Sequence, residues 1–371
     1  MIDPRTHQPS GRARLLSFDG GGIRGLFALQ IAKRIETLLR EKHAQPDLVL
    51  SDHFHYIGGT STGAIIAAFL SWGLPVDRII ALYRENAIAM FQKAGWTERF
   101  TSHRFIAEGL SEFLQKFFVE DDGSPALLGT GKLKTLFLAV TRNASTGSPW
   151  PLSNNPFAKY NNREAPGCNL QIPLWQLVRA STAAPTFFPP EVLHVKGEHG
   201  EPLTFAFEDG GITPFNNPAH LMHVMATLPE YRLGWEMGRD RMSVVSVGTG
   251  GLRTGRGDKL FVDVLAQAKS LPASLISSFQ QYQDFLCRVS GECRHGPCID
   301  GEVGDMIRHN PHAKFLYARY DKLFSDEDLS AAALCTAKGF TLDNLELMEF
   351  LTTCGGRYAE QAVKLEHFDD V

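Results

Sequence analysis

A short apolar strand followed by a glycine-rich turn and a helix occurs twice in the first 72 residues. The first unit has a strand over residues 13–18, a turn with three consecutive glycines, and apolar residues at helical spacing over 26–41. The second has a strand over 54–57, the turn Gly58 to Gly63, and a nearly all-apolar helix over 64–72, which we expect to be buried. Repeated strand–helix units predict an α/β fold with a central, mainly parallel sheet covered on both faces.

Three more strand-like runs follow, at residues 136–141, 203–207 and 242–247, separated by helical segments. They extend the predicted sheet. The intervening segment 85–131 is rich in phenylalanine and reads as mixed helices and loops. Such a segment either packs as ordinary core or forms a cap over an active site, and both interpretations remain open.

The pattern changes after residue 255, where the apolar spacing becomes helical over 260–285 and again over 326–362. We therefore predict a catalytic domain over residues 13–255. A mostly helical C-terminal extension, with a regulatory role as one option, would occupy residues 256–371.

The charge and cysteine content restrict the class of protein. A net charge of −4 argues against a nucleic-acid-binding protein with a broad basic face. Six cysteines are too few for a disulfide framework in a chain of 371 residues. The first 14 residues are polar, and no apolar run reaches the roughly 18 residues of a membrane span. We expect a cytoplasmic protein whose membrane contact is peripheral.

The second turn carries the strongest chemical signal. Residues Gly59 to Gly63 match the nucleophile-elbow pattern G-x-S-x-G, with Ser61 as the nucleophile. The flanking glycines, Gly59 and Gly63, leave room for a strained backbone between strand and helix. The amino end of the following helix would favour negative charge near the serine. The pentapeptide alone is a weak signal, and its position between a strand and an apolar helix is what strengthens it.

A nucleophilic serine needs a base, and the sequence offers an aspartate rather than a histidine. Histidines follow in the chain, but none lies in an obvious loop at the end of a strand. Asp209-Gly210-Gly211 directly follows an apolar strand, and the carboxyl ends of strands carry the sites of open α/β sheets. Asp-Gly is most often an ordinary turn. The alternative is a Ser61–Asp209 dyad in which the carboxylate takes the serine proton.

The first glycine turn has two competing interpretations. It fits the G-x-G-x-x-G fingerprint of dinucleotide-binding folds, and it equally offers backbone N–H groups to an oxyanion. The next strand does not end in an acid placed for a ribose, whereas it does lead to a serine elbow, so we favour the oxyanion hole. The predicted oxyanion hole comprises Gly20, Gly21, Gly22, Arg24 and Gly25. Arg24 could pair with a carboxylate or bind the phosphate of a lipid headgroup.

The C-terminal region contains two groups of chemically active side chains. The first group comprises Cys287, Cys293, His295 and Cys298. Their spacing does not match a standard zinc site, so we expect no metal. The second group could line an anion pocket, although a solvated face is the safer interpretation; its members are Arg288, Arg294, Arg308 and Arg319.

Taken together, the motifs resemble those of the patatin-like phospholipases over roughly residues 13–250. The resemblance rests on Gly20 to Gly25, Gly59 to Gly63 and Asp209 to Gly211, and on the segment Ala180 to Pro185 that precedes the last of these. It implies a three-layer fold and a lipid acyl hydrolase that needs no metal or calcium. By position it implies Ser61 as nucleophile, Asp209 as base and the first glycine turn as oxyanion hole.

The length and the helical tail are similar to the cyclic-dinucleotide-activated patatin phospholipases of bacterial anti-phage systems. This narrower resemblance implies activation by a nucleotide such as cyclic GMP–AMP and hydrolysis of phospholipids in the host's inner membrane. We expect a homo-oligomer that binds no nucleic acid. The alternatives are an ungated lipid acyl hydrolase, a nucleotide-binding oxidoreductase or kinase that uses the first glycine turn, and a pseudoenzyme.

Overall fold

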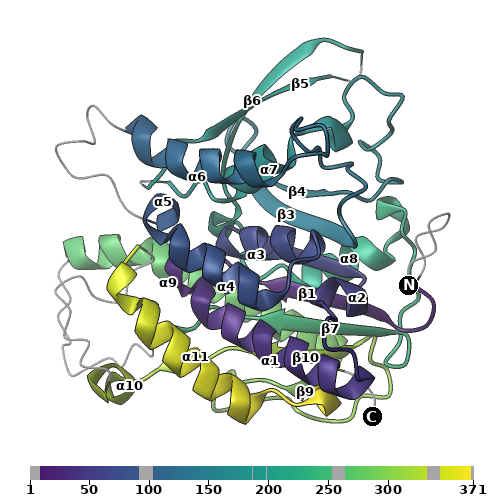
Figure 1. Cartoon of the computed structure of the whole chain (residues 1–371). Helices are drawn as coiled ribbons and strands as arrows, with labels where there is room; N and C mark the ends of the chain where they lie inside the picture. The colour runs from purple at the N-terminus through teal and green to yellow at the C-terminus, as the bar shows by residue number, and fades with distance from the viewer. Residues whose placement is uncertain are drawn as a thin grey trace.

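The computed structural model describes residues 9–91, 103–185, 187–197, 199–252, 264–331 and 343–368. Their strands form one large sheet between layers of helices (Figure 1). The strands of this sheet are β1 (Ala13–Phe18), β2 (Tyr56–Thr60), β3 (Leu136–Asn143), β4 (Ser148–Ser153), β5 (Glu191–Lys196), β6 (Pro202–Asp209), β7 (Met242–Val247), β9 (Glu292–His295) and β10 (Leu316–Tyr320). A separate two-stranded sheet pairs β8 (Gly251–Leu252) with β11 (Leu323–Phe324).

The helices connect and cover these strands. They are α1 (Gly25–His43), α2 (Leu50–His53), α3 (Thr62–Ser71), α4 (Val76–Glu85), α5 (Ala87–Phe91), α6 (His103–Phe117), α7 (Leu174–Ser181), α8 (Ala219–Thr227), α9 (Val264–Ser290), α10 (Asp326–Ala331) and α11 (Met348–Ala362). None of these described helices combines the length and the apolar character needed to cross a bilayer.

The main sheet has the strand order β5-β6-β3-β2-β1-β7-β10-β9. From β3 to β9 along this order all neighbours are parallel, whereas β4 and β6 pair antiparallel with β3, and β5 pairs antiparallel with β6. The prediction of a mainly parallel α/β sheet is therefore confirmed. The predicted strand limits 13–18 and 242–247 coincide with β1 and β7.

Alternate residues of the central strands enter two different apolar cores, as a sheet covered on both faces requires. In β1, Leu16 and Phe18 join the core formed with α1, α3 and α11, while Ala13 and Leu15 join the core formed with α8. Helix α3 is buried along its whole length, as its all-apolar sequence predicted. The result is three layers with the sheet in the middle (Figure 1).

The region after residue 255 contributes more than helices. Helices α9 and α11 are present as expected, and α11 packs along α1 (Figure 1). However, β10 pairs parallel with β7 and β9 pairs parallel with β10, so the C-terminal region also extends the central sheet. These two strands were not expected from the sequence pattern. The proposed boundary at residue 255 lies outside the described residues.

The segment 85–131 packs against the first core where the structure describes it. Phe117 and Phe118 contact Phe69 of α3, with ring centroids 4.7 and 5.4 Å apart. Residues 92–102 lie outside the described part. These contacts account for ordinary packing by α6, and a cap over the active site remains a prediction.

Candidate active site

Ser61 occupies a sharp turn between β2 and α3. Its backbone has φ 56° and ψ −125°, a conformation that is strained for a residue with a side chain. A Cβ atom on Gly59 would collide with the backbone of Gly63, and one on Gly63 would collide with the carbonyl oxygen of Phe18. The two glycines thus let β2, the turn and α3 approach closely enough to hold the serine.

The Ser61 side chain contacts Asp209 directly. Ser61 Oγ donates to Asp209 Oδ2 at 2.6 Å, and the Gly211 N–H donates to Asp209 Oδ1 at 2.6 Å. Asp209 is 4% exposed. Neither side chain hydrogen-bonds to a histidine among the described residues. The structure therefore brings together the two side chains that the sequence selected.

Asp209 reaches the serine because of the way β6 joins the sheet. Asp209 is at the carboxyl end of its strand, as expected, and β6 is antiparallel to β3, where it pairs with the last residues, Thr141 to Asn143. Strand β6 enters from the carboxyl edge of the parallel strands and ends there opposite Thr141, so that Asp209 reaches the serine that follows β2. Gly210 permits this approach, because a Cβ atom at this position would collide with the Val140 carbonyl oxygen.

Burial gives the Asp209 carboxylate a pKa that suits a general base. Desolvation raises the pKa of Asp209 to about 6, while its hydrogen bonds from Ser61 and Gly211 and the charge of Arg179 oppose the rise. The carboxylate is then ionised at neutral pH yet more basic than an exposed aspartate. A base with a pKa just below the working pH can both accept and return a proton.

The first glycine turn lies directly against the serine. A Cβ atom on Gly20 would be 3.2 Å from the Cβ of Ser61. The Gly20 N–H already donates to the Asn216 carbonyl oxygen at 3.2 Å, and the Gly25 N–H donates within its own turn. In the part of the chain that the structure describes, the N–H groups of Gly21 and Gly22 donate no hydrogen bond to protein. These two are therefore the donors best suited to an incoming oxyanion.

Arg24 braces this turn from within the motif. Its guanidinium donates to the carbonyl oxygens of Gly21 at 3.3 Å and Gly250 at 2.6 Å. Both roles considered for Arg24, pairing with a carboxylate and binding a lipid phosphate, stay predictions beside these two contacts. The contacts connect the turn to the loop after β7.

The segment 180–185, noted only as part of a motif, supports both members of the pair. Ser181 Oγ accepts the Ser61 N–H at 2.9 Å and donates to the Val140 carbonyl oxygen at 2.7 Å. The Ala183 carbonyl oxygen accepts the Asp209 N–H at 2.9 Å. These roles were not predicted from the sequence, although the hydroxyl of Ser181 in the segment 180–185 was an available signal.

Two of the four C-terminal arginines are buried, so the expectation of a solvated face was wrong for them. Arg319 pairs with Asp19, and Arg288 pairs with Asp284; both arginines are 2% exposed. Arg294 contacts Glu292, and Arg308 is exposed. Lone arginines in a short pattern look solvated because their partners lie far away in the sequence.

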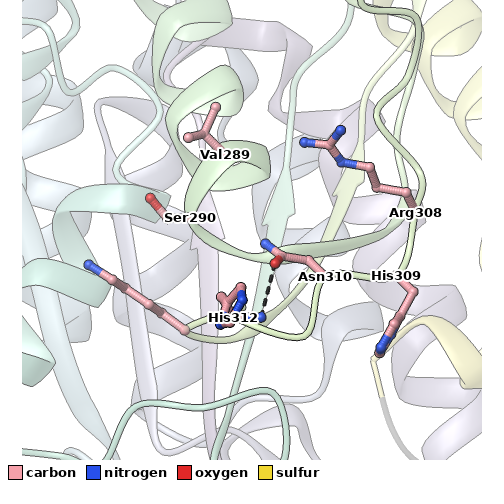
Figure 2. Close-up of a pocket in the computed structure, with 7 residues that line it drawn as sticks. Val289, Ser290, Arg308, His309, Asn310 and His312 are labelled. Atoms are coloured by element: carbon pink, nitrogen blue, oxygen red, sulfur yellow. Dashed lines mark hydrogen bonds between the residues drawn. The ribbon is translucent and has the colours of Figure 1, made fainter.

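Arg308 lines a basic pocket at the other edge of the sheet (Figure 2). This cavity, about 580 Å³, lies between the last turn of α9 and the chain that leads into β10. Its lining residues are Val289, Ser290, Arg308, His309, Asn310, His312 and Lys314. Because Lys314 precedes Leu316, the pocket is at the amino end of β10, whereas the Ser61 turn lies at the carboxyl end of the parallel strands.

The predicted Cys/His group is dispersed. The Cys293 thiol is buried and contacts the His295 carbonyl oxygen, whereas Cys298 is exposed. Among the described residues, no three His, Cys, Asp or Glu side chains are grouped as a metal site requires.

Comparison with known proteins agrees with this geometry. Residues 16–223, more than half of the chain, match the family model described as patatin-like phospholipase. Patatin-T5 of Solanum tuberosum is 27% identical over 252 residues, which cover 64% of this chain and 60% of that protein.

Two bacterial relatives are similar to the same degree. A cGAMP-activated phospholipase of Escherichia coli (strain TW11681) is 26% identical, with 65% of this chain and 63% of that protein covered. One from Vibrio cholerae serotype O1 is 29% identical, with 59% of each chain covered. The matches thus span about 60% of the length of these relatives.

Proposed function

Because this chain belongs to the patatin-like phospholipase family, we propose that it hydrolyses the acyl esters of membrane phospholipids with Ser61 as nucleophile and Asp209 as base. The observation that carries this proposal is the 2.6 Å hydrogen bond from Ser61 Oγ to Asp209 Oδ2 at a strained elbow. Family membership also favours the hydrolase over an oxidoreductase that would use the same glycine turn.

In the first step, the proton of Ser61 moves to Asp209 as Oγ bonds to the ester carbonyl carbon. The carbonyl oxygen becomes an oxyanion, for which the N–H groups of Gly21 and Gly22 are the available donors. The tetrahedral adduct collapses, the lysophospholipid leaves as an alcohol with the proton from Asp209, and an acyl-serine remains. Water, deprotonated by Asp209, then releases the fatty acid and restores Ser61.

The test is the release of fatty acid from phospholipid vesicles, together with labelling by a fluorophosphonate probe. Ser61→Ala should lose both activities while remaining folded. Ser71→Ala is a matched control, because Ser71 is a buried serine in the same helix α3 and lies at its opposite end. Full hydrolysis by Ser61→Ala would disprove the proposed nucleophile.

We further propose that a cyclic dinucleotide activates the enzyme as part of an anti-phage response at the cytoplasmic face of the inner membrane. The two cGAMP-activated relatives support this, although the plant patatin is equally similar. The basic pocket in Figure 2 has the charge that two phosphate groups require, since Arg308 and Lys314 are among its lining residues. Such gating would protect a cell from its own phospholipase.

Measuring fatty-acid release with and without a panel of cyclic dinucleotides tests this second proposal. Strong stimulation by one of them, lost in Arg308→Ala with Lys314→Ala, is the expected result. Equal rates under all conditions would leave an ungated lipid acyl hydrolase. Phage plaque counts on cells that express wild type or Ser61→Ala test the defensive role.

A further inference from the structure

The carboxylate that opens the glycine turn is held by a residue far along the chain. Asp19 is completely buried, and Arg319 of β10, 300 residues later, binds it with both arms of its guanidinium. The Arg319 NH1 group donates to Asp19 Oδ1 at 2.8 Å, and NH2 donates to Oδ2 at 2.6 Å. Two parallel bonds of this kind fix orientation as well as distance.

Two further side chains hold the Asp19 carboxylate and the Arg319 guanidinium in place. Gln280 of α9 donates to Asp19 Oδ2 at 3.1 Å. The Arg319 NH1 group also donates to Ser246 Oγ of β7 at 2.8 Å, which sets the direction of the guanidinium. Asp19 is thereby tied to two elements of the C-terminal region.

A second connection runs from Arg319 to the far side of the turn. The Arg319 NH2 group donates to Asp321 Oδ2 at 2.7 Å, and Asp321 Oδ1 accepts the Gly250 N–H at 3.0 Å. The Gly250 carbonyl oxygen in turn accepts from Arg24, whose Nε binds the Gly21 carbonyl oxygen. Arg319 therefore contacts Asp19 directly, and it is linked to Gly21 through Asp321, Gly250 and Arg24.

We propose that Arg319 is a positioning residue for the oxyanion turn, so that the strand β10 is part of the catalytic apparatus although it lies outside the matched segment 16–223. This inference rests on the proposed hydrolase function. Residues Gly20 to Gly22 follow Asp19 immediately, so any rotation of Asp19 moves the N–H groups of Gly21 and Gly22. A displacement of about 1 Å at such a site can cost about 10²-fold in rate.

The positive charge of Arg319 also affects the oxyanion that forms at the turn. An ionised Asp19 beside the turn would by itself oppose the negative charge that develops on the ester oxygen. The bidentate guanidinium neutralises it. Burial raises the pKa of Asp19 to about 6, and Arg319 acts against this rise.

The test compares two buried arginines. Arg319→Met removes the clamp on the turn, whereas Arg288→Met removes the equally buried arginine that pairs with Asp284 and has no contact with the turn. We expect kcat for a phospholipid or p-nitrophenyl ester to fall about 10²-fold in Arg319→Met, with KM changed less than about 3-fold. In Arg288→Met the folded fraction should keep its kcat within about 3-fold. Both are assayed with and without cyclic GMP–AMP.

Two further variants keep the result interpretable. Arg319→Lys retains the buried charge without the fork and gives a measurement even where the methionine variant does not fold; its kcat should lie between those of wild type and Arg319→Met. The double variant Asp19→Asn/Arg319→Met removes both charges, so its thermal stability should recover while its kcat stays low.

The outcomes separate the two proposals. If Ser61→Ala is inactive but Arg319→Met and Arg319→Lys match Arg288→Met in kcat and in the rate of fluorophosphonate labelling, the positioning role is wrong and the hydrolase stands. If Ser61→Ala remains active, the assignment of Ser61 as nucleophile fails by itself, whatever the result for Arg319. Loss of kcat in Arg319→Met at unchanged KM, with partial rescue by lysine, supports the positioning role.

Discussion

The segment 16–223 and the C-terminal region build the site in different ways. In the first, the working atoms are encoded locally, since the elbow around Ser61 and the Asp209 turn each fit within five residues. In the second, the contribution comes from single long-range pairs, such as Arg319 with Asp19. A short motif can therefore identify the chemistry, whereas the parts that hold it in place are visible only in three dimensions.

Exchanging one buried aspartate in each region should produce opposite effects on stability. Asp209→Asn should lower kcat/KM by about 10³-fold or more, because the base is lost. It should also stabilise the protein: a pKa of about 6 instead of 3.8 means that ionised Asp209 costs up to about 3 kcal/mol above pH 6. Since the folded state binds the proton more tightly, this cost grows from pH 4 to pH 6 and is absent below pH 4.

Asp284→Asn is the matching change in the C-terminal region. It leaves Arg288 buried without its anion and should lower the free energy of unfolding by about 3–5 kcal/mol. Urea denaturation at pH 4 and pH 8 measures both effects. If Asp209→Asn is less stable than the wild type at pH 8, the claim that ionised Asp209 lowers the stability of the folded protein is contradicted.

A glycine in a helix of each region gives the next contrast. Gly63→Ala places a Cβ atom against the Phe18 carbonyl oxygen, so it should displace α3 from the elbow and reduce activity by about 10²-fold or more. Gly356→Ala in α11 meets no atom within 4 Å and should raise stability by about 0.5–1 kcal/mol with unchanged kcat. Melting temperatures and rates of ester hydrolysis measure these effects. Equal changes in both variants would show that the two glycines do not differ in their importance for the site.

The pH profile tests whether the Asp19–Arg319 pair, which joins the two regions, titrates together with the base. Asp209 must be ionised to act as base, so kcat/KM should fall about tenfold per pH unit below about 6. Asp19 has a pKa in the same range, and Arg319, Asp321 and Asp284 are the charges that act on it. Protonation of Asp19 releases the clamp, so the acid limb of the profile should be steeper than that of a single proton.

The double variant Asp19→Asn/Arg319→Met is the control for this profile, because it removes the Asp19 carboxylate and leaves Asp209 to titrate in the site. Its acid limb should follow one proton. A one-proton slope in the wild type would show that the Asp19–Arg319 pair stays charged throughout.

The smallest expected effect concerns Ser181, which links the Ser61 elbow to β3. Ser181→Ala leaves the buried Ser61 N–H and the Val140 carbonyl oxygen each without this partner. We expect a loss of about 1–3 kcal/mol in stability and up to about tenfold in kcat. Thr182→Ala is the neighbouring control, because the Thr182 hydroxyl donates to the Arg179 carbonyl oxygen within its own helix turn. Identical kinetics for both variants would show that Ser181 plays no part in holding the elbow.

Much of the fold could be predicted because its signals are local. The strands β1 and β7 are apolar runs with clear ends, and α3 is apolar on all sides. Strand β10 was missed because Arg319 and two tyrosines interrupt the apolar pattern of Leu316 to Tyr320, although all five residues are buried. The two tyrosines of this run were the available signal for a strand.

The site could be predicted in its chemistry but not in its support. Ser61 and Asp209 were selected by motif, and they lie in hydrogen-bond contact. The antiparallel entry of β6 and the clamp on Asp19 depend on strand order, which no spacing in the sequence reveals. The catalytic roles of Ser61 and Asp209 stay predictions that the variants above test.

The 300-residue separation between Asp19 and Arg319 also has a consequence during synthesis. At about 5–20 residues per second, the ribosome adds Arg319 roughly 15–60 s after Asp19. Throughout that interval the serine elbow already exists as a segment of nascent chain, but the bidentate clamp beside it cannot form. A growing chain, or one terminated before residue 319, therefore lacks the complete turn, and the finished site is assembled only after Arg319 has been added.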